Sequence, residues 1–129
     1  MENLSHKKCI PCQGGIPPMA EDEIKKYLPQ IKIDWQVLPA RIGYAEGVAG
    51  GDNPSATSGQ VKKLHKEFKF KDFKEAMDFV NKVAKIAEEE NHHPNILINY
   101  SKVYIDIWTH SIDGLHENDF ILAAKIDTI

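Results

Sequence analysis

Two adjacent histidines at the end of a charged segment are the residues of this chain best suited to chemistry. Segment 88–94 reads Glu-Glu-Glu-Asn-His-His-Pro and ends with His92, His93 and a proline. A third histidine, His110, follows further along the chain. Imidazole can both donate and accept a proton near neutral pH. If the fold brings these three histidines together, they form an acid–base site.

A β-hairpin would bring them together. Two apolar runs with the alternation of β-strands are separated by a connection too short for anything but an antiparallel hairpin. These runs are 95–100 and 102–108. With a turn near Ser101, the numbers of opposed residues sum to about 202, and opposed Cβ atoms lie roughly 5 Å apart. This register places His92 opposite His110 and His93 opposite Thr109.

Two acidic residues could position the imidazoles. Glu88 lies one helical turn before His92 and could orient its ring or stabilise its charged form, or it is simply an exposed member of an acidic run. Asp119 is the expected third residue of the last helix, where it could support a histidine or only complement the helix N-terminus. Both interpretations stay open for each acid. The remaining histidines are expected to be surface or hydrogen-bonding residues: His6, His65 and His116.

Metal binding is the competing chemistry, because three histidines and an acid can hold zinc or iron. Adjacent histidines in an extended segment point apart, however, and the spacings HxxxH, HxH and HExxH are all missing. Cys9 and Cys12 form a single half-site, which is equally a redox or incidental motif. We therefore predict no metal and keep a metal-dependent histidine cluster as the less favoured alternative.

The elements that must position these residues have the order α-β-β-α-β-β-α. This order predicts an α+β domain, a four-stranded antiparallel sheet with three helices packed on one face. The clearest helix runs from 73 to 90, between a capping-box-like Asp72 and the helix-breaking Pro94. The other expected elements are helices at about 20–28 and from near 116, and strands around 35–37, 64–70, 95–100 and 102–108.

The bulk composition limits the possibilities further. A chain of 129 residues suffices for one domain, which we place at 19–129 after a flexible tail at 1–18. A net charge of -3 gives no sign of direct binding to nucleic acid or to an anionic membrane. The lysine-rich run 62–74 is expected to be a solvated strand face, and the Gly- and Ser-rich stretch 43–59 a long loop. Since neither a membrane span nor a secretory signal is present, we expect the cytoplasm.

The residues with chemical potential, taken in order, resemble the pterin-4a-carbinolamine dehydratase family. Its signature is an acid, three residues, His-His-Pro, an aromatic residue, a later histidine and then an aspartate. The corresponding residues here are Glu88, His92, His93, Pro94, Tyr100, His110 and Asp119. The segment 68–73 and the Gly114-Leu115 pair are also similar. The resemblance is strong over 61–129 and weaker around Trp35 and the first helix.

The resemblance implies a hydro-lyase without a cofactor. Such enzymes dehydrate 4a-hydroxytetrahydrobiopterin to the quinonoid dihydropterin and so help to recycle the cofactor of aromatic amino acid hydroxylases. Carried over by position, the catalytic and pterin-binding histidines are His92, His93 and His110, without a division into acid and base. Glu88 and Asp119 are then supporting residues, and the substrate contacts are Thr109, Trp108 and Pro94.

The resemblance also implies partners and shows departures. Members form dimers or tetramers, and some pair with a transcription factor, so a non-catalytic protein-binding module is the alternative function. Direct contact with nucleic acid or with a membrane is not expected. Ile96 stands where many members have an aromatic residue, and Trp108 precedes Thr109 where a small or hydroxyl residue is frequent. His116 replaces a Ser or Thr cap, which is expected to weaken the start of the last helix.

Overall fold

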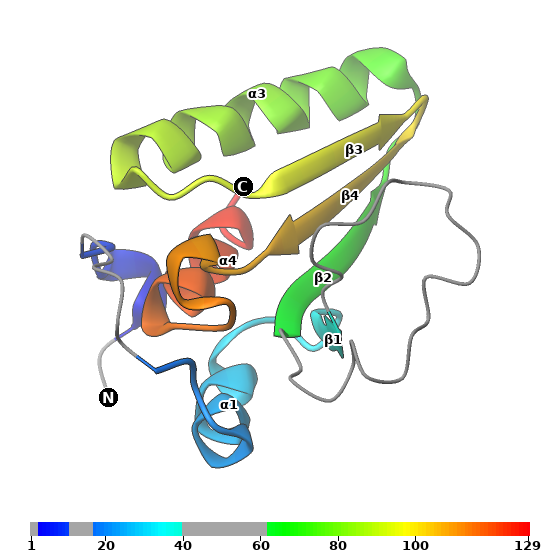
Figure 1. Ribbon diagram of the computed structural model, residues 1–129. Helices are drawn as coiled ribbons and strands as arrows, with labels where there is room; N and C mark the ends of the chain where they lie inside the picture. Colours follow the sequence, from blue (N-terminus) through cyan, green and yellow to red (C-terminus); the bar gives the residue numbers. More distant parts are fainter. Residues whose placement is uncertain (1–2, 11–16, 40–61) are drawn as a thin grey trace.

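The computed structural model describes residues 3–10, 17–39 and 62–129. Within these ranges the chain follows the predicted order of helices and strands (Figure 1). The elements are α1 (Glu21–Tyr27), β1 (Gln36–Pro39), β2 (Lys62–Lys69), α3 (Phe73–Glu90), β3 (Asn95–Asn99), β4 (Lys102–Ile107) and α4 (Glu117–Ile126), with 3-10 turns η1 (Leu4–His6), η2 (Leu28–Gln30) and η3 (His110–Ile112). The predicted loop at 43–59 and Cys12 lie outside the described residues.

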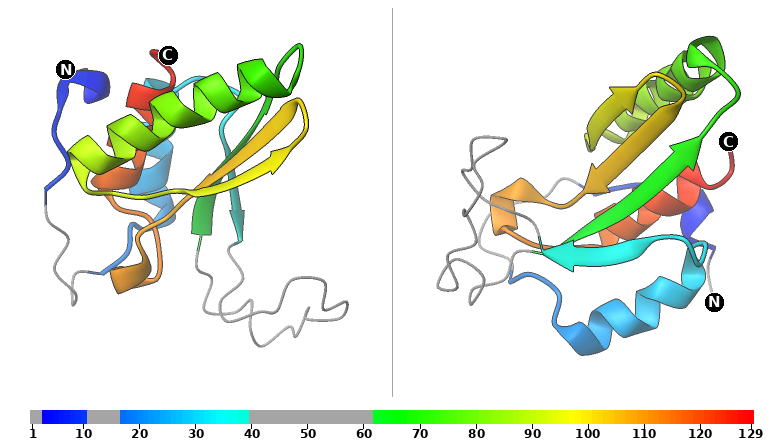
Figure 2. Two further views of the ribbon diagram at one scale, coloured as in Figure 1. Left: turned by 90° about the horizontal axis from the view of Figure 1, so that it is seen from above. Right: turned by 90° about the vertical axis from the view of Figure 1, so that its right-hand side faces the viewer.

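The four strands form one antiparallel sheet in the order β1-β2-β4-β3, so the predicted α+β class is confirmed. The three α-helices lie on one side of it (Figure 2). On the two central strands, β2 and β4, that side carries completely buried residues at alternate positions: Leu64, Val103, Ile105 and Ile107. On the edge strand β3 the alternate residues Ile96 and Ile98 are half-buried. In the part of the chain that is described, no helix is long and apolar enough to cross a membrane.

The helix α3 occupies the predicted range and ends where the site begins. Asp72 accepts a hydrogen bond from the backbone N–H of Glu75 at 2.9 Å, which caps the helix start. At the other end Asn91 adopts the left-handed conformation with φ of 51°. The backbone N–H of His92 then donates to the carbonyl of Ala87 at 3.1 Å, which closes the last turn. This tight ending carries the chain out of the helix at His92.

The register of the β3–β4 hairpin is one residue away from the predicted one. Asn99 pairs with Lys102, so the turn consists of Tyr100 and Ser101, with Tyr100 at φ of 54°. The prediction was wrong because its turn was centred on Ser101 alone. The regular pairing also ends at Asn95, opposite Asp106, and therefore does not continue to the histidines.

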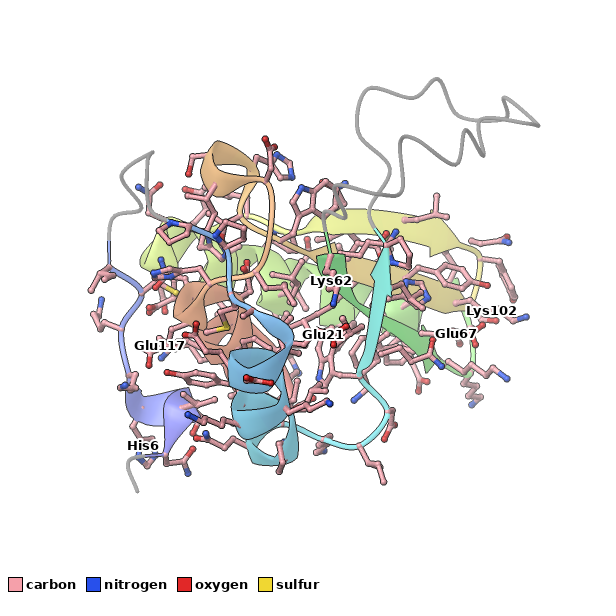
Figure 3. The ribbon with its side chains drawn as sticks, turned by 60° about the horizontal axis from the view of Figure 1, so that its bottom comes forward. His6, Glu21, Lys62, Glu67, Lys102 and Glu117 are labelled. Carbon is pink, nitrogen blue, oxygen red and sulfur yellow. The ribbon has the colours of Figure 1, made fainter. Side chains whose placement is uncertain are left out.

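The N-terminal residues 3–10 pack against α4, whereas a flexible tail was expected over 1–18. Leu4 is 2% exposed and belongs to the core. The Nζ of Lys125 donates to the carbonyl of Ser5 at 3.0 Å, and the Nζ of Lys7 donates to Glu117 at 3.1 Å. Glu117, at the start of α4, lies beside this segment (Figure 3). The segment therefore completes the packing of α4, which is why that helix is buried on nearly all sides.

One lysine of the run 62–74 is buried, although the whole run was predicted to be a solvated strand face. Lys66 shares the inward side of β2 with Leu64 and is 6% exposed. Its Nζ lies 3.2 Å from Oδ1 of Asp127 and 4.8 Å from the ring centre of Phe68. The indole Nε1 of Trp35 donates to the same Asp127 oxygen at 2.9 Å. Asp127 thus joins β2, the segment before β1 and the end of α4.

We expect Asp127→Ala to lower the free energy of unfolding by about 3–5 kcal/mol, because it leaves the Lys66 ammonium buried without its main partner. The double variant Lys66→Met/Asp127→Ala should be more stable than Asp127→Ala, since it removes the unpaired charge. Urea unfolding at neutral pH measures both. A double variant less stable than Asp127→Ala would contradict this interpretation.

Candidate active site

The three predicted histidines line one cleft of about 380 Å³. His92 and His93 enter it from the segment after α3, and His110 enters from η3 after β4. Other hollows on the surface are larger, including one of about 630 Å³ beside α1, but their linings contain none of these residues. The cleft is distinguished by its chemistry, because it gathers three groups that can exchange protons near neutral pH.

Asp119 holds His92 in place. Its Oδ1 lies 2.6 Å from Nε2 of His92, and the Asp119 side chain is completely buried. Its Oδ2 accepts hydrogen bonds from the Thr109 hydroxyl at 2.9 Å and from the backbone N–H of His116 at 2.8 Å. A buried carboxylate requires such donors, and here three donors surround it. Asp119 therefore completes the cap of α4 and at the same time fixes the position of the His92 ring.

His116 caps the last helix. Its Nδ1 accepts a hydrogen bond from the backbone N–H of Asn118 at 3.2 Å, and with Asp119 it forms a reciprocal capping box. The departure from a Ser or Thr cap therefore leaves the helix start with a side-chain acceptor. His116 was expected to be a surface or hydrogen-bonding residue near the start of the last helix, and its role as a hydrogen-bonded cap agrees with the second of these expectations.

Glu88 lies beside His93 and is not bonded to His92. Its Oε1 is 3.2 Å from Nε2 of His93, and the two side chains are 79% and 54% exposed. The left-handed Asn91 separates His92 from the helical face that carries Glu88. A side-chain contact so open to solvent contributes little to stability.

The residues around His110 form another part of the cleft lining. The rings of Trp108 and His110 are 4.3 Å apart, and both residues line the cleft. Thr109 exchanges two backbone hydrogen bonds with Gly114, which close the loop that carries His110. Pro94, a predicted substrate contact, instead lines a neighbouring hollow beside His65 and Asp106.

The cleft also contains residues that were not predicted as part of a site, among them Ile10 and Asn118. Ile10 lies in the segment expected to be a flexible tail, and Asn118 lies in the first turn of α4. Asn118 is 2% exposed, which is unusual for an amide side chain and requires hydrogen-bond partners. No local sequence pattern marks either residue, because their contact joins positions far apart in the chain.

Cys9, next to this cleft, is unsuited to nucleophilic chemistry. Burial raises the pKa of its thiol to about 12, and the nearby carboxylates of Glu90 and Asp119 act in the same direction. The thiol therefore stays protonated at neutral pH. Over residues 3–10, 17–39 and 62–129, no group of three or more His, Cys, Asp and Glu side chains is arranged to hold a metal ion.

Known proteins with similar sequences and folds bear on this site. The model of the family described as "Pterin 4 alpha carbinolamine dehydratase" matches residues 17–129. A protein of Rickettsia canadensis (strain McKiel) named "Putative pterin-4-alpha-carbinolamine dehydratase" is 44% identical over 99% of this chain and 98% of its own length. An equally named protein of Alkaliphilus metalliredigens (strain QYMF) is 43% identical over 98% of this chain and 96% of its own.

A solved structure is similar along most of the fold. It is the crystal structure of a "transcriptional coactivator/pterin dehydratase" from Brucella melitensis, with a TM-score of 0.63 and 27% identity. The similarity covers 86% of this chain and 96% of that one. The likeness therefore extends over nearly all of the Brucella chain and includes both the sheet and its helices.

We expect Asp119→Ala to lower the free energy of unfolding by about 2–4 kcal/mol, because it removes a helix cap and leaves buried donors without an acceptor. Asp78→Ala, an exposed aspartate within α3, is the matched control and should change it by less than about 0.5 kcal/mol. Chemical denaturation of the three proteins measures the difference. Equal effects of the two substitutions would show that Asp119 is not the buried junction described above.

Proposed function

Because the chain belongs to the pterin-4a-carbinolamine dehydratase family, we propose that it dehydrates a 4a-hydroxytetrahydropterin, as a hydro-lyase of the cytoplasm. The observation that carries the proposal is the Asp119–His92 pair in a cleft that also contains His93 and His110. A cleft of about 380 Å³ is within the size range of small-molecule sites. The cleft that contains the three histidines thus combines space for a bicyclic ring with groups that transfer protons.

The reaction needs only an acid and a base. The bond between C4a and the hydroxyl oxygen breaks, and a proton joins that oxygen, which leaves as water. N5 loses its proton, and its electron pair forms the C4a–N5 double bond of the quinonoid dihydropterin. No electrons are gained or lost overall. General acid–base catalysis by positioned histidines fits both proton transfers.

The hydrogen bond to Asp119 suggests a role for His92. An ionised carboxylate can only accept, so the Nε2 of His92 carries a hydrogen, and in the neutral ring Nδ1 keeps a lone pair. Nδ1 has no hydrogen-bond partner among the described residues. His92 is therefore the base that takes the N5 proton, and the proton for the leaving hydroxyl comes from His93 or His110. Thr109 is a positioning residue, because its hydroxyl is bonded to Asp119.

Trp108 supplies the flat surface of the cleft. It is half-buried and tilted by 38° against the ring of His110. A pterin ring stacked on such an indole gains the offset contact that aromatic systems favour. Trp108 therefore offers the stacking surface for the substrate in the same cleft as the proton-transferring histidines.

The decisive measurement is turnover of a freshly generated 4a-hydroxytetrahydropterin, followed by its absorbance change. His92→Ala and His110→Ala should each lower kcat/KM by roughly 10²–10⁴-fold, the usual contribution of a positioned acid or base. His6→Ala removes an exposed histidine of η1 and should leave the rate unchanged. A chelator should have no effect. Wild-type rates in both cleft variants would refute the site, and loss of activity with loss of a bound metal would favour the metal-dependent alternative.

A protein-binding role is the second candidate, because the Brucella structure is also named a transcriptional coactivator. The edge strand β3 leaves its outer backbone unpaired within the described sheet, and Leu97 on it is 61% exposed. An edge of this kind favours pairing with another chain. A folded protein with no pterin turnover would favour this second function.

We expect a homodimer or homotetramer in solution. Light scattering coupled to size-exclusion chromatography should give two or four times the 14.6 kDa mass of the chain. Leu97→Lys, which places a charge on the exposed face of β3, should shift the distribution towards the monomer. A wild-type monomer at micromolar concentration would contradict the expectation.

A further inference from the structure

We propose that the N-terminal segment 3–10 holds Ile10, its one residue in the lining, as a fixed wall of the pterin cleft, and that Ile10 contacts the substrate away from its reacting atoms. The family match begins at residue 17, so this segment lies outside it. The structure nevertheless places Ile10 in the lining of the cleft together with His92 and His93. The inference rests on the proposed function for the identity of the ligand.

Asn118 holds Ile10 through both of its polar atoms. Its Oδ1 accepts a hydrogen bond from the backbone N–H of Ile10 at 3.0 Å, and its Nδ2 donates to the Ile10 carbonyl at 2.7 Å. A side-chain amide paired in this way satisfies both the N–H and the C=O of one residue, as a neighbouring strand does in a β-sheet. Asn118 is 2% exposed and lies in the first turn of α4, next to Asp119 in the sequence. It therefore fixes the main chain of Ile10 relative to Asp119.

Glu90 provides a second attachment, from the end of α3. Its Oε1 accepts a hydrogen bond from the backbone N–H of Cys9 at 2.8 Å, and its side chain is 5% exposed. The Nζ of Lys125 lies 3.8 Å from the other oxygen of Glu90 and offsets part of its buried charge. The segment is thus bound to both helix ends that carry the site, α3 before His92 and α4 before Asp119.

The far end of the segment is anchored as well. Leu4 is buried in the core, and Glu117 accepts hydrogen bonds from Lys7 and, at 2.7 Å, from the Tyr27 hydroxyl. Burial opposes the ionisation of Glu117, but these two donors outweigh it and hold the pKa of the carboxyl below its ordinary value. The carboxylate is therefore charged at neutral pH, and the attachment to Lys7 persists there.

Fixed in this way, Ile10 presents an apolar side chain that is 59% exposed beside a group of polar residues. Because the main chain of Ile10 is already fixed by these hydrogen bonds, a contact with substrate requires no further ordering of the backbone. The Ile10 side chain touches no reacting group, so its contact is equally strong in the ground state and the transition state. Ile10 therefore contributes to KM and to substrate preference, and Asn118 is the residue that positions it.

The test compares point variants of the full-length chain. Ile10→Ala should raise KM about five- to tenfold, as loss of about half of an isoleucine contact predicts, while kcat changes less than about twofold. Lys8→Ala, an exposed change in the same segment, is the control and should match the wild type. Asn118→Asp keeps the shape of the side chain and the oxygen that accepts from the Ile10 N–H. It replaces the Nδ2 donor with a second oxygen, which faces the Ile10 carbonyl without a hydrogen bond. It should reproduce the KM effect of Ile10→Ala, and the double variant should add little to either.

Binding of 7,8-dihydrobiopterin, measured by calorimetry, separates this proposal from the proposed function. Turnover by the wild type with unchanged KM in Ile10→Ala and Asn118→Asp would overturn the role of the segment and leave the dehydratase function intact. Absence of turnover, with pterin binding that weakens in both variants, would overturn the function and support the wall. Neither turnover nor pterin binding by the wild type would overturn both. Circular dichroism and thermal unfolding confirm that each variant is folded.

Discussion

A buried carboxylate is the constraint on which the rest of the structure depends. Asp119 is completely removed from water and is stabilised by donors from three places, the start of α4, the end of β4 and the segment after α3. A charge in such a position is tolerated only while all of its donors stay in place. The same hydrogen bonds that satisfy Asp119 therefore hold the two ends of the cleft together. One buried residue thus both supports the fold and orients the ring of His92, so the position of His92 depends on the folding of α4.

Local signals explain what could be predicted from the sequence. The range of α3 follows from Asp72, an apolar stripe and Pro94, all of which act within a few residues of the element they define. The alternation of apolar residues was sufficient to predict the hairpin. Its register depends on Tyr100, which adopts the left-handed conformation in the turn. A tyrosine does not indicate such a turn in the sequence, whereas an Asn-Gly pair would. Burial of Lys66 was invisible because its partner Asp127 comes from the other end of the domain.

The candidate site divides in the same way. His92, His93 and His110 were gathered correctly into one cleft by hairpin reasoning, although the register behind it was one residue off. Glu88 was assigned by helical spacing, which fails here because the helix ends before the spacing applies. Ile10 and Asn118 could not be found, since their pairing spans most of the chain and an asparagine can bond to any passing backbone.

The attachment of residues 3–10 to α4 has a consequence for biosynthesis. The ribosome makes this segment long before α4, yet the two are adjacent in the folded protein. Leu4, which is buried in the folded protein, cannot be buried by these contacts until α4 has been made, because contacts between distant parts of a chain form only after loop closure. The cleft is therefore completed only after α4 has emerged from the exit tunnel, and a truncated product that lacks α4 would have neither the wall nor the buried carboxylate.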